Sequence, residues 1–187
     1  MLVPGLFAGT QKIEELLQHG NTGIGTLTGL DGELVIIDSK VYQVNAQGAV
    51  REVGSEEEVP FANVHYQADK SVGKLQGLDL SGFQKTVLER LQTANLFAAV
   101  RVEGRFTQMH TRAVLPQQPP YPTLTETASG QKEFNAENIK GTLIGYYSPD
   151  LYAGAVSPGF HLHFLDADHH MGGHILGFEL DLSLIHI

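Results

Sequence analysis

Apolar residues recur every three to four positions in two stretches of the chain, residues 10–18 and 81–92. This spacing places the apolar side chains on one face, which predicts two amphipathic helices. Thr10 is expected to cap the first helix. The second is expected to start at Ser81, which stands three residues before Gln84, the spacing of a capping box.

Most other apolar residues alternate with polar ones or form short runs bounded by glycine, which predicts strands. The expected strands cover residues 23–28, 33–37, 41–44, 97–102, 106–114, 141–147, 160–165 and 173–180. A turn at residues 30–32, Leu-Asp-Gly, joins the first two as a hairpin. Many strands with few helices predict an α+β fold.

A cluster of prolines divides the chain. Four of the eight prolines fall within seven positions, at Pro116, Pro119, Pro120 and Pro122. Because proline cannot donate to a sheet ladder, the segment is expected to be a connection. A proline-rich ligand for a partner protein is the alternative interpretation.

The proline cluster leads to a prediction of two related, mixed or antiparallel β-sheet halves. We expect an N-terminal α+β half at residues 1–115 and a connection at 116–137. A partial, β-rich C-terminal half follows at 138–181, and its strands are expected to carry a metal site.

Both ends of the chain have short apolar runs. Residues 1–9 lack the basic start of a secretory signal, so we expect a cytoplasmic protein, although a longer natural N-terminus would allow export. Residues 182–187 read Leu-Ser-Leu-Ile-His-Ile, like a translated sequencing adaptor. We therefore expect a non-native tail and missing C-terminal residues; an ordinary apolar strand end is the alternative.

Composition narrows the classes of function. The 187 residues include 12 Lys and Arg against 21 Asp and Glu, a formal net charge of −9. Such a balance argues against nucleic-acid and polybasic membrane-surface binding, because both need clustered cations. Cysteine is absent, which excludes disulfides and thiolate metal ligands. We expect a small-molecule partner, no nucleic acid and no membrane, and allow for a homodimer.

The chain has nine histidines, and the spacing of three of them indicates a possible metal site. His161 and His163 alternate with apolar residues in a predicted strand, so both imidazoles point to the same face. His174 stands on the predicted return strand and can complete a set of three. A single strand histidine is more often structural, but this spacing favours a metal site.

Zinc suits three imidazoles, because catalytic zinc usually has three protein ligands and one open position. Nickel or iron with a carboxylate is also compatible with the spacing. His169 and His170 fall in the turn between the two strands and are expected to be exposed or to lie outside the ligand set.

The chain resembles the bacterial α-acetolactate decarboxylases over nearly all of residues 6–181. The resemblance is carried by residues 23–34, 119–122, 141–145 and 159–177. The segment 159–177 is the most specific of these. The resemblance implies that His161, His163 and His174 bind zinc.

The resemblance also assigns roles that the residue pattern alone does not. Glu33 matches the acidic residue beside the metal, Arg112 the active-site arginine, and Thr26 a threonine that lines the substrate pocket. From pattern alone, Glu33 reads as a solvated turn residue, Arg112 as an edge-strand charge and Thr26 as a strand former. The family has a further essential glutamate downstream of the histidines, beyond the last residue of this sequence, so an inactive truncated chain is an alternative expectation.

The function implied is conversion of 2-acetolactate to acetoin and CO₂, with zinc stabilising an enediolate that is then protonated on one face. Glu33 and Arg112 are the expected catalytic residues, and Thr26 and Arg112 are expected to contact the substrate. A non-catalytic metal-binding fragment is one alternative. Another metal-dependent lyase or dioxygenase with a His-x-His motif is the other.

Overall fold

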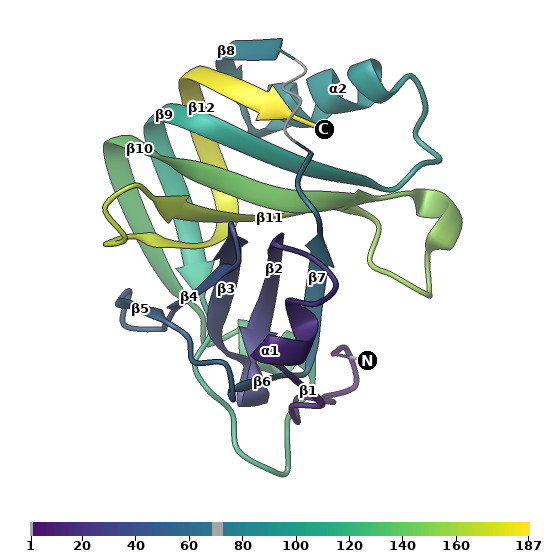
Figure 1. Cartoon of the computed structure of the whole chain (residues 1–187), viewed down its shortest axis with the longest axis vertical. Helices are drawn as coiled ribbons and strands as arrows, with labels where there is room; N and C mark the ends of the chain where they lie inside the picture. The colour runs from purple at the N-terminus through teal and green to yellow at the C-terminus, as the bar shows by residue number, and fades with distance from the viewer. Residues whose placement is uncertain (1, 69–72) are drawn as a thin grey trace.

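The computed structural model describes residues 2–68 and 73–187, so Met1 of the apolar N-terminal run lies outside them. Two five-stranded sheets and a two-stranded one make up most of this part of the chain (Figure 1). The predicted α+β class is confirmed. No described helix has the length and apolar character that a membrane crossing requires.

The first sheet has the strand order β5-β4-β3-β2-β7, and every neighbouring pair is antiparallel. The elements of this part of the chain are β1 (Gln11–Lys12), α1 (Ile13–Leu16), β2 (Thr22–Leu27), η1 (Thr28–Leu30), β3 (Asp31–Ile37), β4 (Lys40–Val44), β5 (Val50–Glu52), β6 (Glu58–Val59) and β7 (Phe61–His65).

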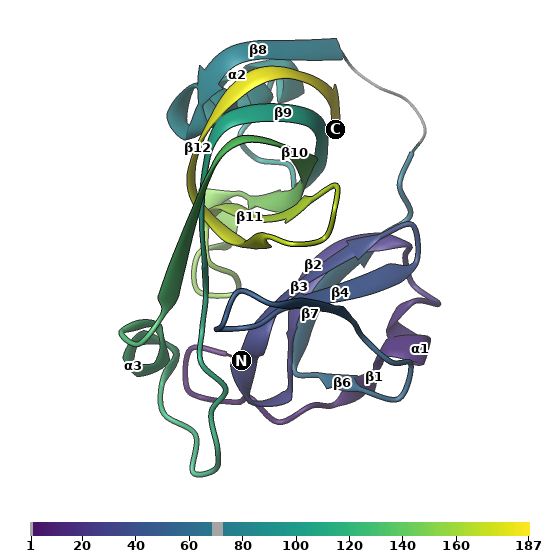
Figure 2. The same ribbon diagram turned by 90° about the vertical axis from the view of Figure 1, so that its left-hand side faces the viewer.

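The second sheet has the order β11-β10-β9-β12-β8. Its part of the chain contains β8 (Gly73–Asp79), α2 (Leu80–Leu91), β9 (Ala98–Ala113), α3 (Leu124–Ala128), β10 (Lys132–Ser148), η2 (Asp150–Tyr152), β11 (Gly159–Asp166) and β12 (Gly172–His186). An additional pairing of β11 with β12 closes β9, β10, β11 and β12 into a ring. Figure 2 shows these strands curving past α2.

The first sheet is buried on both faces, so all six residues of β2 are buried. One face packs on α1 through a cluster that includes Ile13, Leu34 and Ile36. The other face meets the second sheet, where Ile24 and Val35 pack with residues of β10 and β11. The two sheets therefore share an apolar contact, and β3 and β11 are held against each other.

Several predicted boundaries differ from the structure. The strands expected at 97–102 and 106–114 are one continuous strand, β9, because Gly104 is not a turn residue: it pairs with both β10 and β12. A Cβ at Gly104 would lie 2.4 Å from the carbonyl oxygen of Leu182, so glycine permits the close approach of β12.

Both helix starts were also predicted wrongly. The first helix is a single turn, α1, preceded by Lys12 with no side-chain cap, so Thr10 does not cap it. The second is capped by Asp79, whose carboxylate accepts a hydrogen bond from the backbone N–H of Gly82, and not by Ser81. Asp and Ser are comparable caps, so residue type alone does not distinguish Asp79 from Ser81.

The proline-rich segment lies in the connection between β9 and β10, which are neighbours in the second sheet. Strand β10 begins at Lys132, within the expected connection 116–137. Strands from both sides of the prolines thus belong to one sheet, so the boundary between the sheets differs from the expected boundary. Residues 182–186 continue β12 and pair with β8 and β9; their non-native origin stays a prediction.

The core of the second sheet yields a test of the fold. Phe106 is fully buried and packs edge-on against Phe164 and Phe178. Phe106→Ala is expected to lower the free energy of unfolding by about 3–5 kcal/mol, because it leaves a cavity between strands. Urea unfolding measures the loss. The control Phe97→Ala, at a residue that is 53% exposed, should cost about 1 kcal/mol or less; equal losses would contradict this packing.

Candidate metal centre

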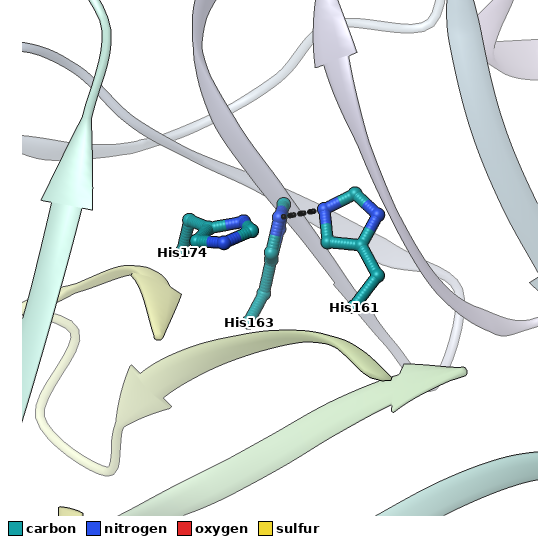
Figure 3. Close-up of side chains that lie close together, drawn as sticks. All are labelled: His161, His163 and His174. Carbon is teal, nitrogen blue, oxygen red and sulfur yellow. Dashed lines mark hydrogen bonds between the residues drawn. The ribbon is translucent and has the colours of Figure 1, made fainter. Parts of the chain in front are cut away.

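Three histidine side chains converge where β11 meets β12. His161 and His163 lie two residues apart on β11, and His163 pairs directly with His174 of the antiparallel β12. One ring nitrogen from each lies within 4.8 Å of the others, close enough to hold one metal ion. Figure 3 shows the three rings gathered together. The structure therefore brings together the three histidines that the spacing singled out.

His163 is oriented by the other sheet. Its ring is fully buried, and its Nδ1–H donates a hydrogen bond to the carbonyl oxygen of Leu34 on β3, at 2.8 Å. In the neutral ring this leaves the lone pair on Nε2, which lies 3.1 Å from Nε2 of His161. A backbone carbonyl that fixes the imidazole tautomer in this way is typical of metal-binding histidines.

The other two rings have different surroundings. His161 is stacked nearly parallel to Phe61 of β7, with ring centroids 6.0 Å apart. Nδ1 of His174 is buried and has no hydrogen-bond partner among the described residues. A buried polar atom without a partner is costly, and a metal ion at the centre would relieve part of that cost for the cluster. The donor set therefore fits a bound divalent ion.

Burial keeps the three imidazoles uncharged. Desolvation lowers the pKa of His161 to about 4 and that of His174 to about 2, and Arg112 adds to both shifts. The pKa of His163 lies well below its usual range, first through burial and then through its histidine neighbours. Because a metal binds the neutral ring, these shifts leave the cluster ready to bind at neutral pH.

Glu33 and Arg112 form an ion pair beside the histidines. Nη1 of Arg112 lies 3.5 Å from Oε1 of Glu33, and Oε2 of Glu33 lies 3.3 Å from Nε2 of His163. Glu33 is 7% exposed, so it is not the solvated turn residue that the pattern alone suggests. Burial raises the pKa of Glu33 to about 7, while Arg112 opposes that rise.

Arg112 reaches the site from an inner strand. It stands on β9 and pairs with His174 on one side and Glu133 on the other, so the edge-strand interpretation is wrong. Its side chain is 19% exposed. A guanidinium held there faces a carboxylate on one side and remains partly open to a small anion.

Thr26 lies nearby but is engaged in a structural contact. Its hydroxyl donates a 2.7 Å hydrogen bond to the carbonyl oxygen of Gly32, just before Glu33. This bond fastens the turn between β2 and β3. Thr26 also pairs with Phe61 on the neighbouring strand. A direct role of Thr26 in substrate binding stays a prediction.

Sequence reasoning did not identify two residues that contact the histidine cluster, Phe61 and Leu34. Phe61 was not singled out because an aromatic residue in a strand is usually part of a core. The Leu34 carbonyl carries no side-chain signal at all. His169 and His170, expected to be outside the cluster, are exposed in the turn, where the ring of His169 lies 4.3 Å from that of Tyr42.

Comparison with known sequences places this arrangement in a family. A family model described as alpha-acetolactate decarboxylase matches residues 1–187. A relative of that name from Brevibacillus brevis is 36% identical over 100% of this chain and 66% of its own length. One from Methanosarcina mazei is 36% identical over 96% of this chain and 63% of its own. The chain thus spans about two thirds of the length of these relatives.

Solved structures agree with the sequence comparison. A Staphylococcus aureus protein, described as of unknown function and similar to alpha-acetolactate decarboxylase, is 39% identical, with a TM-score of 0.92 over 99% of this chain and 81% of its own. The alpha-acetolactate decarboxylase of Bacillus subtilis strain 168 is 31% identical, with a TM-score of 0.93 over 98% and 79%. The chain therefore belongs to the alpha-acetolactate decarboxylase family.

Proposed function

We propose that this protein converts 2-acetolactate to acetoin and CO₂, the activity for which its relatives are named. The observation that carries the proposal is the joint position of three neutral imidazoles and the Glu33–Arg112 pair. Imidazoles alone make a metal site. A cation and a protonatable carboxyl beside that site supply what decarboxylation and reprotonation require.

Zinc is the ion we propose for the three histidines. Three nitrogen donors without a thiolate suit a catalytic zinc that keeps a position open for substrate. When bound, the ion supplies Lewis acidity where negative charge develops on the substrate oxygens. The protein's own contribution is to hold the imidazoles neutral and oriented, through burial and the Leu34 carbonyl.

Arg112 is suited to bind and orient the anionic substrate. Loss of CO₂ breaks a carbon–carbon bond and leaves the electron pair as enediolate charge on the remaining fragment. A fixed guanidinium stabilises such charge without having to reorient, and it does not lose its own proton. Its position against Glu33 keeps the cation at the site before substrate arrives.

Glu33 is suited to handle the proton. In the metal-free protein burial raises the pKa of Glu33 to about 7, so the carboxyl can both hold and release a proton near neutral pH. Delivery from a carboxyl fixed on one side of the site would place the new proton on one face of the enediolate. A stereoselective product is therefore expected.

Local charge is needed because the whole chain is acidic. At a formal net charge of −9, the overall field repels an anionic substrate. Arg112 and a bound divalent cation would make the site positive against that background. A homodimer and a cytoplasmic location stay predictions.

The metal hypothesis is tested by removing the most buried ligand. His163→Ala is expected to abolish both zinc binding and CO₂ release, because two ligands in this geometry hold zinc weakly. Metal content and acetoin formation are measured on the same preparation. His19→Ala, which removes an exposed histidine, should change neither. Full activity in His163→Ala would end the metal hypothesis.

A substitution of Arg112 tests whether metal binding and turnover can be separated. Arg112→Ala is expected to keep zinc and to lose turnover by on the order of 100-fold or more, because it removes a fixed charge at the reacting oxygens. Arg105→Ala, on the same strand but with a side chain that is 56% exposed, should leave turnover unchanged. Loss of zinc in Arg112→Ala would show that the arginine has a different role.

The lowered histidine pKa values predict acid sensitivity of the metal-free protein. The folded state disfavours protonated imidazoles, whereas histidines in the unfolded chain titrate near 6.5. As pH falls from about 7 to about 5, the unfolded chain takes up protons that the folded protein does not, so the free energy of unfolding decreases. Thermal melts with a chelator present measure the decrease. The double variant His161→Gln/His174→Gln should lose less stability over this range; an equal loss would contradict the assignment.

A further inference from the structure

The position of His174 opposite His163 involves a short stretch of pairing between β11 and β12. Strands β11 and β12 share three residue pairs: His163 with His174, Phe164 with Gly173, and Leu165 with Gly172. A register slip of one residue would turn every side chain on β12 to the opposite face. His174 would then leave the cluster. Pairing with β9, where His174 lies opposite Arg112, helps to set this register, and the turn that joins β11 to β12 is the remaining constraint beside the three pairs.

Asp166 ends β11 and organises the turn that follows. Its Oδ1 accepts hydrogen bonds from the backbone N–H groups of His170 and Met171, both at 2.7 Å. Its Oδ2 accepts a third from the N–H of Asp168 at 3.3 Å. The residue is 6% exposed, so this carboxylate is satisfied by the turn's own backbone and is shielded from water.

The far end of the turn is anchored from β9. The buried hydroxyl of Thr111 donates a 2.7 Å hydrogen bond to the carbonyl oxygen of Gly172. Gly173 has a φ of +122°, and a Cβ there would lie 2.5 Å from the carbonyl oxygen of Arg112. Residues 172 and 173 therefore fit against β9 in one arrangement, with His174 immediately after them.

We infer that Asp166 is a positioning residue for the metal centre, acting with Thr111 to hold His174 opposite His163. The effect of Asp166 on catalysis rests on the proposed function, whereas its effect on the turn does not. Asp166 is not one of the three candidate ligands. It acts by accepting hydrogen bonds from the N–H groups of Asp168, His170 and Met171, so that the turn leads β12 into the register that presents the third imidazole.

The variant Asp166→Ala removes both acceptor oxygens. Zn²⁺ affinity, measured by competition with a chromogenic chelator, is expected to fall by about 10–100-fold, the usual effect of losing a residue that orients a metal ligand. Asp166→Asn keeps an oxygen that can accept from His170 and Met171 and should bind Zn²⁺ within about threefold of the parent protein. Thr111→Val, which removes the second anchor alone, should weaken Zn²⁺ as well and serves if Asp166→Ala fails to fold.

Asp79→Ala is the matched control for general loss of stability. It removes another carboxylate that accepts a 2.7 Å backbone hydrogen bond, at the start of α2 and away from the histidines. It is expected to lower the melting temperature, by less than Asp166→Ala does because Asp79 is exposed and accepts one hydrogen bond, and to leave Zn²⁺ affinity unchanged. Parental Zn²⁺ affinity in Asp166→Ala, or an equal loss in Asp79→Ala, would overturn the inference.

Backbone amide hydrogen exchange of the metal-free proteins separates this inference from the proposed function. Exchange at residues 170–174 is expected to be faster in Asp166→Ala than in Asp79→Ala. If the parent protein binds no Zn²⁺, the proposed metal function fails, and the exchange rates alone decide whether Asp166 orders the turn. Unchanged exchange at these residues would overturn the inference even in a zinc-binding protein.

Discussion

Burial of three uncharged imidazoles at the junction of two sheets is the constraint on which the site depends. Apolar packing between the first sheet and β10 and β11 brings β3 against β11. The hydrogen bond from His163 to the Leu34 carbonyl then crosses that junction and fixes one ring. The same desolvation that keeps the imidazoles neutral raises the pKa of Glu33, so one physical cause acts on both the candidate metal ligands and the carboxyl proposed to carry the proton.

The histidine cluster could be predicted from the sequence because its geometry follows from strand periodicity. Side chains two residues apart share a face, which places His161 and His163 together without any knowledge of the fold. The return strand of the same hairpin brings His174 beside them. Thr26, Glu33 and Arg112 differ in this respect, because a lone threonine, glutamate or arginine in a strand pattern indicates nothing. Only the family resemblance singled them out. The structure shows that Glu33 is buried and that Arg112 stands on an inner strand.

Other features could not be predicted because they arise from contacts distant in sequence. Gly104 looks like a turn signal locally, yet the close approach of β12 determines its use within β9. The proline-rich segment connects β9 and β10, two neighbouring strands of one sheet. Their long pairing depends on residues on both sides of that segment. The Leu34 carbonyl and the anchoring of the β11–β12 turn are backbone interactions. A sequence pattern of side chains contains no direct signal for them.

The central claim is that His161, His163 and His174 share one divalent ion, and X-ray absorption at the zinc edge of the zinc-loaded protein tests it most directly. About three imidazole nitrogens are expected at roughly 2.0–2.1 Å from the zinc, with oxygen ligands completing the shell. A shell made of oxygen ligands with one imidazole or none would contradict it, because the ion would then be bound elsewhere on the protein.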